Sequence, residues 1–279
     1  MDSLPSRIRL VHTESERLAR YLGTLSPDAW LHPSACAGWE VGDVVAHLTR
    51  GAEAYIEWIT RGLQGDTAPP LGVPAAGTGE DATSAVRRAQ RARDVHARLG
   101  DQLFTTFQAR TDQFNALVAD LSTPHWTVLC YHPTRLRPVR DFVALRLTEL
   151  VLHGWDIESR LESSAHLSAE SLPVCLELLP DMLAWAFHPG PSLPAPVRCR
   201  LVGADQAPHR YELVSTGNQA WLVAPEPERT PVSCQCDTET FVLLMSGRLS
   251  MPVARVEGRL RLEGDTQLMT ALTHWFQGN

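Results

Sequence analysis

The stretch of sequence that decides the fold is Gly38-Trp39-Glu40-Val41-Gly42-Asp43-Val44-Val45-Ala46-His47-Leu48. From Val41 to Leu63 apolar residues recur at helical spacing, which predicts an amphipathic helix over 41–63. Glu40 and Asp43 stand near its start, where acidic side chains suit the positive end of the helix dipole. Because His47 lies among apolar residues, we expect its imidazole to face the interior.

A second stretch, far along the chain, carries the other candidate side chains. They are Arg146, Glu149, His153 and Asp156, which follow one another at helical intervals. On a helix such intervals place all four on one face, and Glu149 and His153 can then reach a single ion. Together with His47 they would supply two imidazoles and one carboxylate, a set typical of an open divalent-metal site. Taken on spacing alone, a surface charge pair and a hydrogen-bonded core histidine are the more common interpretation of these residues.

The chain divides into a helical part and a strand-bearing part. We expect helices over 6–22, 41–63, 83–121 and 138–161, the third being one helix or two pieces that meet at Gly100. Helices with these connections predict a four-helix bundle. A linker helix over 169–187 and a proline-rich break follow. Strands are expected over 197–202, 210–215, 220–223, 232–236 and about 253–262, and helices over 238–245 and 266–276. The predicted fold class is therefore α plus α+β, with a bundle over 1–165 and a linker helix and small α+β domain over 166–279.

The composition excludes several mechanisms. The 279 residues include 25 basic and 32 acidic side chains, and every basic residue is arginine. Without lysine there is no Schiff-base lysine, no pyridoxal-phosphate anchor and no P-loop lysine. The net charge of −7 argues against a nucleic-acid partner. The apolar runs are too short for a membrane span and the first residues form no signal peptide, so we expect a cytoplasmic protein.

The cysteines predict no disulfide framework. They are Cys36, Cys130, Cys175, Cys199, Cys234 and Cys236, scattered along the chain. A chain of this length does not need disulfides to fold, so we expect free thiols. Cys234 and Cys236 share one face of a strand-like run and are interpreted as structural.

Taken together, the two stretches resemble the signatures of the mycothiol-dependent maleylpyruvate isomerase family, whose helical domain is a DinB-like bundle. The second signature is Arg146-x-x-Glu149-x-x-x-His153-Gly154-x-Asp156. The C-terminal part is similar to the family's sterol-carrier-like domain, on the pieces Phe241-x-x-x-Met245-x-Gly247-Arg248, Val256-x-Gly258, Gly264-Asp265 and Leu268. The resemblance covers most of the chain. A departure is Gly42, where the family often has a larger residue.

By this resemblance His47, Glu149 and His153 are the ligands of a divalent metal, usually zinc, and mycothiol is the thiol cosubstrate. We expect Arg146 and Asp156 to support these ligands, although Asp156 could equally be an exposed neighbour. The residues that could line a pocket are Trp39, Trp155, His125 and His132. The family's catalytic arginine is not assigned; Arg248, Arg259 and Arg261 are the candidates.

A zinc ion with these ligands keeps positive charge and would hold a thiol as thiolate at neutral pH. We therefore expect an enzyme that activates mycothiol for S-transfer or thiol exchange on a small electrophile, such as an intermediate of an antibiotic pathway. One alternative is a mycothiol-dependent cis–trans isomerase of the maleylpyruvate type. Others are a metal-activated hydroxide that hydrolyses an ester or amide, and a non-catalytic module that binds a small apolar molecule in the C-terminal domain.

Overall fold

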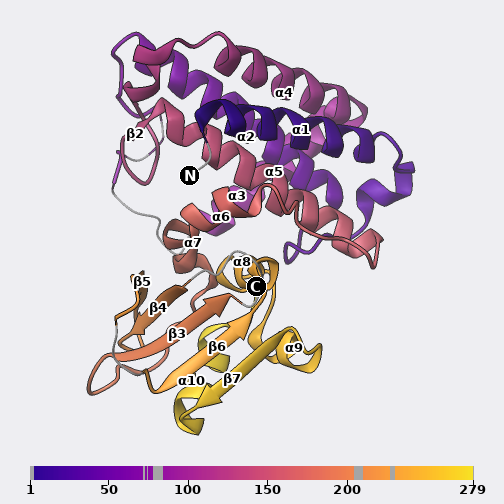
Figure 1. Ribbon diagram of the computed structural model, residues 1–279. Coiled ribbons are helices and arrows are strands. Elements are labelled where there is room, and N and C mark those ends of the chain that lie inside the picture. Colours follow the sequence, from indigo (N-terminus) through magenta and orange to yellow (C-terminus); the bar gives the residue numbers. More distant parts are fainter. Residues whose placement is uncertain are drawn as a thin grey trace. The chain divides into compact units, whose positions relative to one another are not determined.

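The computed structural model describes residues 3–71, 73, 75–77, 84–203, 210–226 and 230–278. Figure 1 shows the elements in chain order. The chain splits into two compact units, Met1–His166 and Leu167–Asn279. The first unit contains α1 (Leu4–Leu22), α2 (Val41–Leu63), α3 (Ser84–Leu99), α4 (Leu103–Ala119) and α5 (Val139–Leu161). Short 3-10 turns lie at Pro27–Leu31, Gly100–Gln102 and Thr123–Thr127, and β1 (Leu129–Cys130) pairs antiparallel with β2 (Arg137–Pro138).

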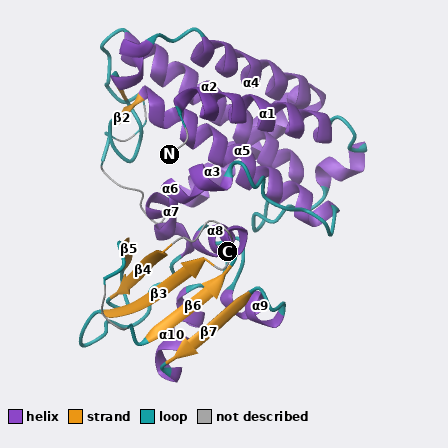
Figure 2. Cartoon of the chain, viewed as in Figure 1, coloured by secondary structure: helices purple, strands orange, loops and turns teal. Residues whose placement is uncertain are grey.

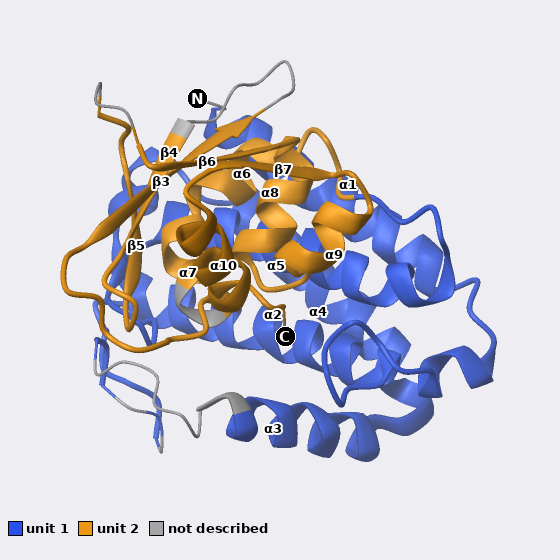
Figure 3. Cartoon of the chain, turned by 90° about the horizontal axis from the view of Figure 1, so that it is seen from below, with its two compact units in different colours: residues 1–166 blue, residues 167–279 orange. Residues whose placement is uncertain are grey.

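Four of these helices form the bundle: α1, α2, α4 and α5 pack side by side. The segment 83–121 is two helices rather than one, because Gly100 takes a left-handed backbone with φ of 47° and turns the chain. Both pieces pack against α2, so α3 flanks the bundle as an additional helix. Figure 3 shows α3 as a separate rod at the edge of the first unit.

The start of α2 is held by its own side chains and by α3. Glu40 caps the helix and the Asp43 carboxylate accepts the Glu40 backbone N–H at 3.1 Å. The other Asp43 oxygen lies 2.9 Å from Nδ1 of His96 on α3. A Cβ at Gly42 would overlap the His96 ring. Gly42 is therefore required by the close approach of α3, which accounts for its departure from the family pattern.

The second unit consists of one sheet and several short helices (Figure 2). The helices are α6 (Leu172–Glu177), α7 (Leu179–Ala186), α8 (Thr238–Met245), α9 (Met251–Val256) and α10 (Thr266–Trp275). The strands are β3 (Val197–Gly203), β4 (Arg210–Ser215), β5 (Ala220–Val223), β6 (Val232–Cys236) and β7 (Leu260–Gly264). Their order is β5-β4-β3-β6-β7; β3 and β6 are parallel, and the other pairs are antiparallel. Burial alternates along β3 and β6, so one face of the sheet belongs to the core.

One predicted strand was wrong. The segment 253–262 was expected to be extended, but its first part belongs to the helix α9. The Ser250 hydroxyl accepts the backbone N–H of Val253, and Pro252 occupies the first turn, so local capping starts a helix there. Gly258, with φ of 73°, then turns the chain into β7.

Among the described residues, every helix is too short or too polar to span a bilayer. The six cysteines are free thiols, of which five are buried and Cys36 is half-exposed.

Candidate metal centre

The packing of α2 against α5 brings two predicted histidines together. The rings of His47 on α2 and His153 on α5 lie edge to face, with their centroids 4.8 Å apart. The Trp39 ring lies 5.5 Å from His47 on another side, also edge to face. The two signatures, distant in the chain, thus meet within the bundle.

The surroundings of the His47 imidazole favour its neutral form. Burial lowers its pKa well below the ordinary value, and the positive charges of His153, Arg88 and Arg146 lower it further. The ring is therefore neutral at physiological pH, which is the form that binds a metal ion. Within the described part of the chain its nitrogens take part in no hydrogen bond.

Glu149 has one satisfied and one unsatisfied oxygen. Its Oε1 accepts a hydrogen bond from the Tyr55 hydroxyl at 3.0 Å. Its Oε2 is buried without a hydrogen-bond partner, 3.8 Å from Nη1 of Arg146. A Cβ at Gly51 would lie 3.0 Å from this oxygen, so the glycine on α2 leaves the room that the carboxylate fills. Burial raises the pKa of Glu149 although Arg146, His153 and Tyr55 act to lower it.

Arg146 is held rigidly behind the carboxylate. It is 0% exposed, its Nη1 donates to the Leu48 carbonyl at 2.9 Å, and its Nη2 donates to the Thr111 hydroxyl at 3.2 Å. These bonds connect α5 to α2 and α4. The guanidinium therefore places a fixed positive charge beside Glu149.

Asp156 contacts His153, as expected of a residue that supports a ligand, and is not an exposed neighbour. Its Oδ2 lies 2.8 Å from Nδ1 of His153, and its side chain is 1% exposed. The Cys36 thiol donates to the same oxygen at 3.2 Å, and the Ala35 backbone N–H donates to the Asp156 carbonyl at 2.8 Å. Since Nδ1 of His153 faces Asp156, an ion shared with His47 would be met by Nε2.

The donors present suit a divalent cation. Two imidazoles and a carboxylate with an unmet oxygen are the ligand types that zinc takes. Ligand atoms of His47, Glu149 and His153 do not all lie within 4.8 Å of one another, and the Glu149 oxygens contact Tyr55 and Arg146. The three side chains would have to move toward one another to hold one ion.

Two other groups of described residues do have three ligand atoms within 4.8 Å of one another. One contains Glu40, Asp43 and His96, whose contacts are explained by the capping of α2 and its packing against α3. The other contains Cys36, His153 and Asp156.

The predicted pocket residues occupy different surroundings. Trp39 contacts His47, whereas Trp155 is half-buried and makes no ring contact with a described residue. His125 accepts the backbone N–H of Ser122 and caps its own turn. His132 packs its ring against Trp58 and Phe142, at 5.7 and 6.0 Å.

Two side chains at the centre were not predicted from the sequence. Tyr55 lies two helical turns after His47, so the spacing within 41–63 could have placed it on the same face. Cys36 lies in the loop before α2, where no periodicity indicates which way a side chain points.

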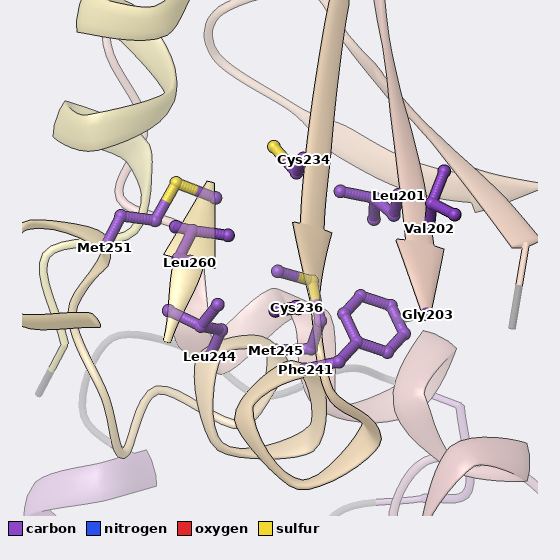
Figure 4. Close-up of a pocket in the computed structure, with 10 residues that line it drawn as sticks. All are labelled: Leu201, Val202, Gly203, Cys234, Cys236, Phe241, Leu244, Met245, Met251 and Leu260. Atoms are coloured by element: carbon purple, nitrogen blue, oxygen red, sulfur yellow. The ribbon is translucent and has the colours of Figure 1, made fainter. Parts of the chain in front are cut away.

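The second unit has a cavity of a different kind. It is small, with room for about one water molecule, and is partly open to solvent. Figure 4 shows its lining: apolar and sulfur side chains from β3, β6, α8, α9 and β7, with Phe241, Met251 and Leu260 among them. Its described lining carries no carboxylate, imidazole or guanidinium, and Arg259 and Arg261 bind Thr240 and Glu263 instead. The groups of described residues that could hold a metal ion lie in the first unit.

Known proteins resemble this chain in part of its sequence and in its fold. The family model for the mycothiol maleylpyruvate isomerase N-terminal domain matches residues 11–158. No curated protein matches the chain. The crystal structure of the mycothiol-dependent maleylpyruvate isomerase has a TM-score of 0.66 at 14% identity and covers 95% of both chains. A histidine-to-alanine mutant of that isomerase gives 0.65 with the same identity and coverage. The match to a sterol carrier protein 2-like protein from Aedes aegypti covers 35% of this chain and 90% of that protein at 16% identity. Its TM-score is only 0.25.

At 14% identity the isomerase structures show the fold, and they confirm the predicted class of a helical domain followed by a small α+β domain. The family model spans more than half of the chain. The protein therefore belongs to the family of the mycothiol maleylpyruvate isomerase N-terminal domain.

Proposed function

We propose that this protein is a metal-dependent enzyme that uses mycothiol to isomerise a cis double bond in a small electrophile of the maleylpyruvate type. Family membership and the fold of the isomerase support isomerisation better than the S-transfer expected from the sequence. The observation that carries the proposal is that α2 and α5 bring the His47 and His153 rings to 4.8 Å, while Oε2 of Glu149, one helical turn before His153, is buried without a hydrogen-bond partner.

The chain's own residues prepare this centre. Asp156 accepts a hydrogen bond from the Nδ1–H of His153 and so fixes the orientation of the ring. Tyr55 donates to Oε1 of Glu149 and leaves Oε2 for a cation, while the charge of Arg146 opposes the effect of burial and favours the ionised carboxylate. The lowered pKa of His47 keeps that imidazole neutral. A divalent ion held by the three side chains would keep a coordinated thiol in its thiolate form at neutral pH.

The thiol supplies the nucleophile, because the chain has no lysine and its half-exposed cysteine, Cys36, donates a hydrogen bond to Asp156. Addition of the thiol to one carbon turns the double bond into a single bond that rotates, and loss of the thiol restores it in the trans form. The thiol is regenerated in this cycle, whereas S-transfer would consume it.

The test measures metal content and thiol-dependent turnover together. Elemental analysis of the purified protein is run beside Glu149→Gln and His47→Ala, with His125→Ala as the matched control because His125 caps a distant turn. Each protein is then given maleylpyruvate with and without mycothiol. We expect near-stoichiometric metal in the wild type and the control, and a loss of metal and of turnover by at least about 100-fold in the two variants.

Three outcomes would overturn the proposal. A wild-type protein that takes up no added zinc has no such centre. Turnover that does not need the thiol would exclude thiol addition, and a stable thiol–substrate adduct would replace isomerisation by S-transfer.

A further inference from the structure

Three donor atoms of different chemistry converge beside the proposed centre, on Cys36, His153 and Asp156. Nδ1 of His153 lies 2.8 Å from Oδ2 of Asp156, and the Cys36 sulfur lies 3.2 Å from that oxygen and 4.0 Å from that nitrogen. The sulfur, the nitrogen and the oxygen thus form a small triangle. A thiol, an imidazole and a carboxylate are each a ligand of zinc and related ions.

The size of the triangle fits a tetrahedral ion. With metal–ligand bonds of about 2.0–2.3 Å, the edges between ligands are roughly 3.3–3.6 Å. The three observed separations of 2.8, 3.2 and 4.0 Å lie on both sides of this range. Each donor therefore has to move by only a few tenths of an ångström to bind one ion together with the other two.

The backbone holds the triangle in place before any ion arrives. The Ala35 N–H donates to the Asp156 carbonyl at 2.8 Å, which fixes the loop before α2 onto α5. The same loop is closed on itself by the Ser34 N–H, which donates to the Trp39 carbonyl at 2.9 Å. Asp156 is 1% exposed, while Cys36 is half-exposed. The group is therefore rigid at its base and open on the cysteine side.

We propose that Cys36, His153 and Asp156 form a second cation site that takes a thiophilic divalent ion such as Zn²⁺ or Cd²⁺. Binding displaces the thiol proton of Cys36 and the Nδ1 proton of His153 to solvent, and no electron is transferred. The ion keeps one open position on the exposed side. This site uses Nδ1 of His153, whereas the proposed catalytic set uses Nε2. The two sites therefore share one imidazole, and only one of them is occupied at a time.

The ligand types set the preference of each site. The thiolate of Cys36 favours soft ions, whereas Glu149 and two imidazoles favour a borderline ion such as zinc. Cadmium is therefore drawn to the cysteine side. This inference does not depend on the proposed function, because it needs neither His47 nor Glu149.

The experiment titrates the wild-type protein with Cd²⁺ alone, without thiol or substrate, and follows the ultraviolet charge-transfer band of a cadmium–thiolate bond. We expect a band that saturates at one equivalent. The double variant His47→Ala/Glu149→Gln keeps the band, and Cys36→Ser loses it, with cadmium affinity weakened by at least about tenfold.

A matched control is required because two other thiols in the chain lie close together and could also bind cadmium. The thiols of Cys199 and Cys234 lie 3.2 Å apart in the sheet of the second unit. Cys234→Ser must keep the band if Cys36 is the ligand. A band that survives in Cys36→Ser, or disappears in Cys234→Ser, overturns the proposal, as does the absence of any band in the wild type.

A measurement without substitution guards against a misfolded variant. Wild-type protein is treated with iodoacetamide in the presence and absence of Cd²⁺, and alkylation of Cys36 is measured by peptide mass spectrometry. We expect cadmium to slow alkylation of Cys36 by at least about tenfold. Equal rates would overturn the site.

The two proposals fail in different ways. If Glu149→Gln loses zinc and thiol-dependent turnover, the proposed function is supported. If the wild type then shows no cadmium band, the second site alone is overturned. A Cys36-dependent band in a protein without thiol-dependent turnover would do the reverse.

Discussion

Glu212 in the second unit is a buried carboxylate and Glu149 in the first is a half-buried one, and their partners differ. Glu212 on β4 is 0% exposed and accepts hydrogen bonds at 2.8 Å from Arg198 and from Arg200 on the neighbouring strand β3. Glu149 on α5 accepts one hydrogen bond, from Tyr55, and its second oxygen has none.

The pKa directions follow from these partners. Burial acts to raise the pKa of Glu212, but the bonds from Arg200 and Arg198 outweigh it, so the pKa is lowered. For Glu149 burial prevails and the pKa is raised. A carboxylate with a complete set of donors stabilises the fold, whereas one with an unmet oxygen is expected to bind a cation.

The largest effect is expected from Glu212→Ala. Its removal deprives two arginines of their shared acceptor and should lower the free energy of unfolding of the second unit by about 2–3 kcal/mol. Because Arg198 and Arg200 remain 37% and 28% exposed, water can partly replace the carboxylate, which keeps the loss below that of a fully buried pair. Urea unfolding with hydrogen exchange of β3 and β4 measures it.

Arg261→Ala serves as the control, since the Arg261–Glu263 pair is exposed on both sides and should change stability by less than about 0.5 kcal/mol. An equal effect of both substitutions would contradict the distinction between buried and exposed pairs.

The pH dependence of the second unit provides the next test. A carboxylate with a lowered folded-state pKa contributes stability that is present above the ordinary glutamate pKa of about 4.3 and is lost as the pH falls through the folded value. We therefore expect the wild type to lose stability on acidification below pH of about 4, and Glu212→Gln to show a flatter profile. Parallel profiles would show that Glu212 is not the group involved.

A smaller effect is expected from Tyr55→Phe, which removes the hydrogen bond to Oε1 of Glu149. The free energy of unfolding should fall by about 1 kcal/mol in metal-free protein. It should fall by less in a Glu149→Gln background, where the charged acceptor is absent. A double-mutant cycle by thermal unfolding measures this coupling. Additive effects would mean that the 3.0 Å contact carries no coupling.

The smallest effect is expected from Glu149→Gln itself. Since burial disfavours the charged form, a neutral side chain of the same shape should leave the metal-free protein within about 1 kcal/mol of the wild type, with the sign toward stabilisation. The measurement is chemical denaturation after chelation. A loss as large as that of Glu212→Ala would show that Glu149 is structural and would remove the contrast between the two carboxylates.

Local pattern was sufficient for much of the fold. The helix predicted over 41–63 is α2, and the runs over 210–215, 220–223 and 232–236 are β4, β5 and β6, because periodicity and turn residues act within a few positions. The strand expected over 253–262 failed where the Ser250 cap overrode the strand-like composition. Helical spacing also placed Glu149, His153 and Asp156 on one face of α5 without any tertiary information.

What spacing could not supply is contact between segments. Three features of the site depend on how α2, α5 and the loop before α2 pack. His47 lies against His153, Cys36 reaches Asp156, and Oε2 of Glu149 lies beside Gly51 without a hydrogen-bond partner. Such contacts arise from side chains that fill shared space, and no interval along one chain encodes them. The residue types and helix faces were thus determined by the sequence alone, whereas only the tertiary structure decided which donors meet and which carboxylate oxygen stays without a partner.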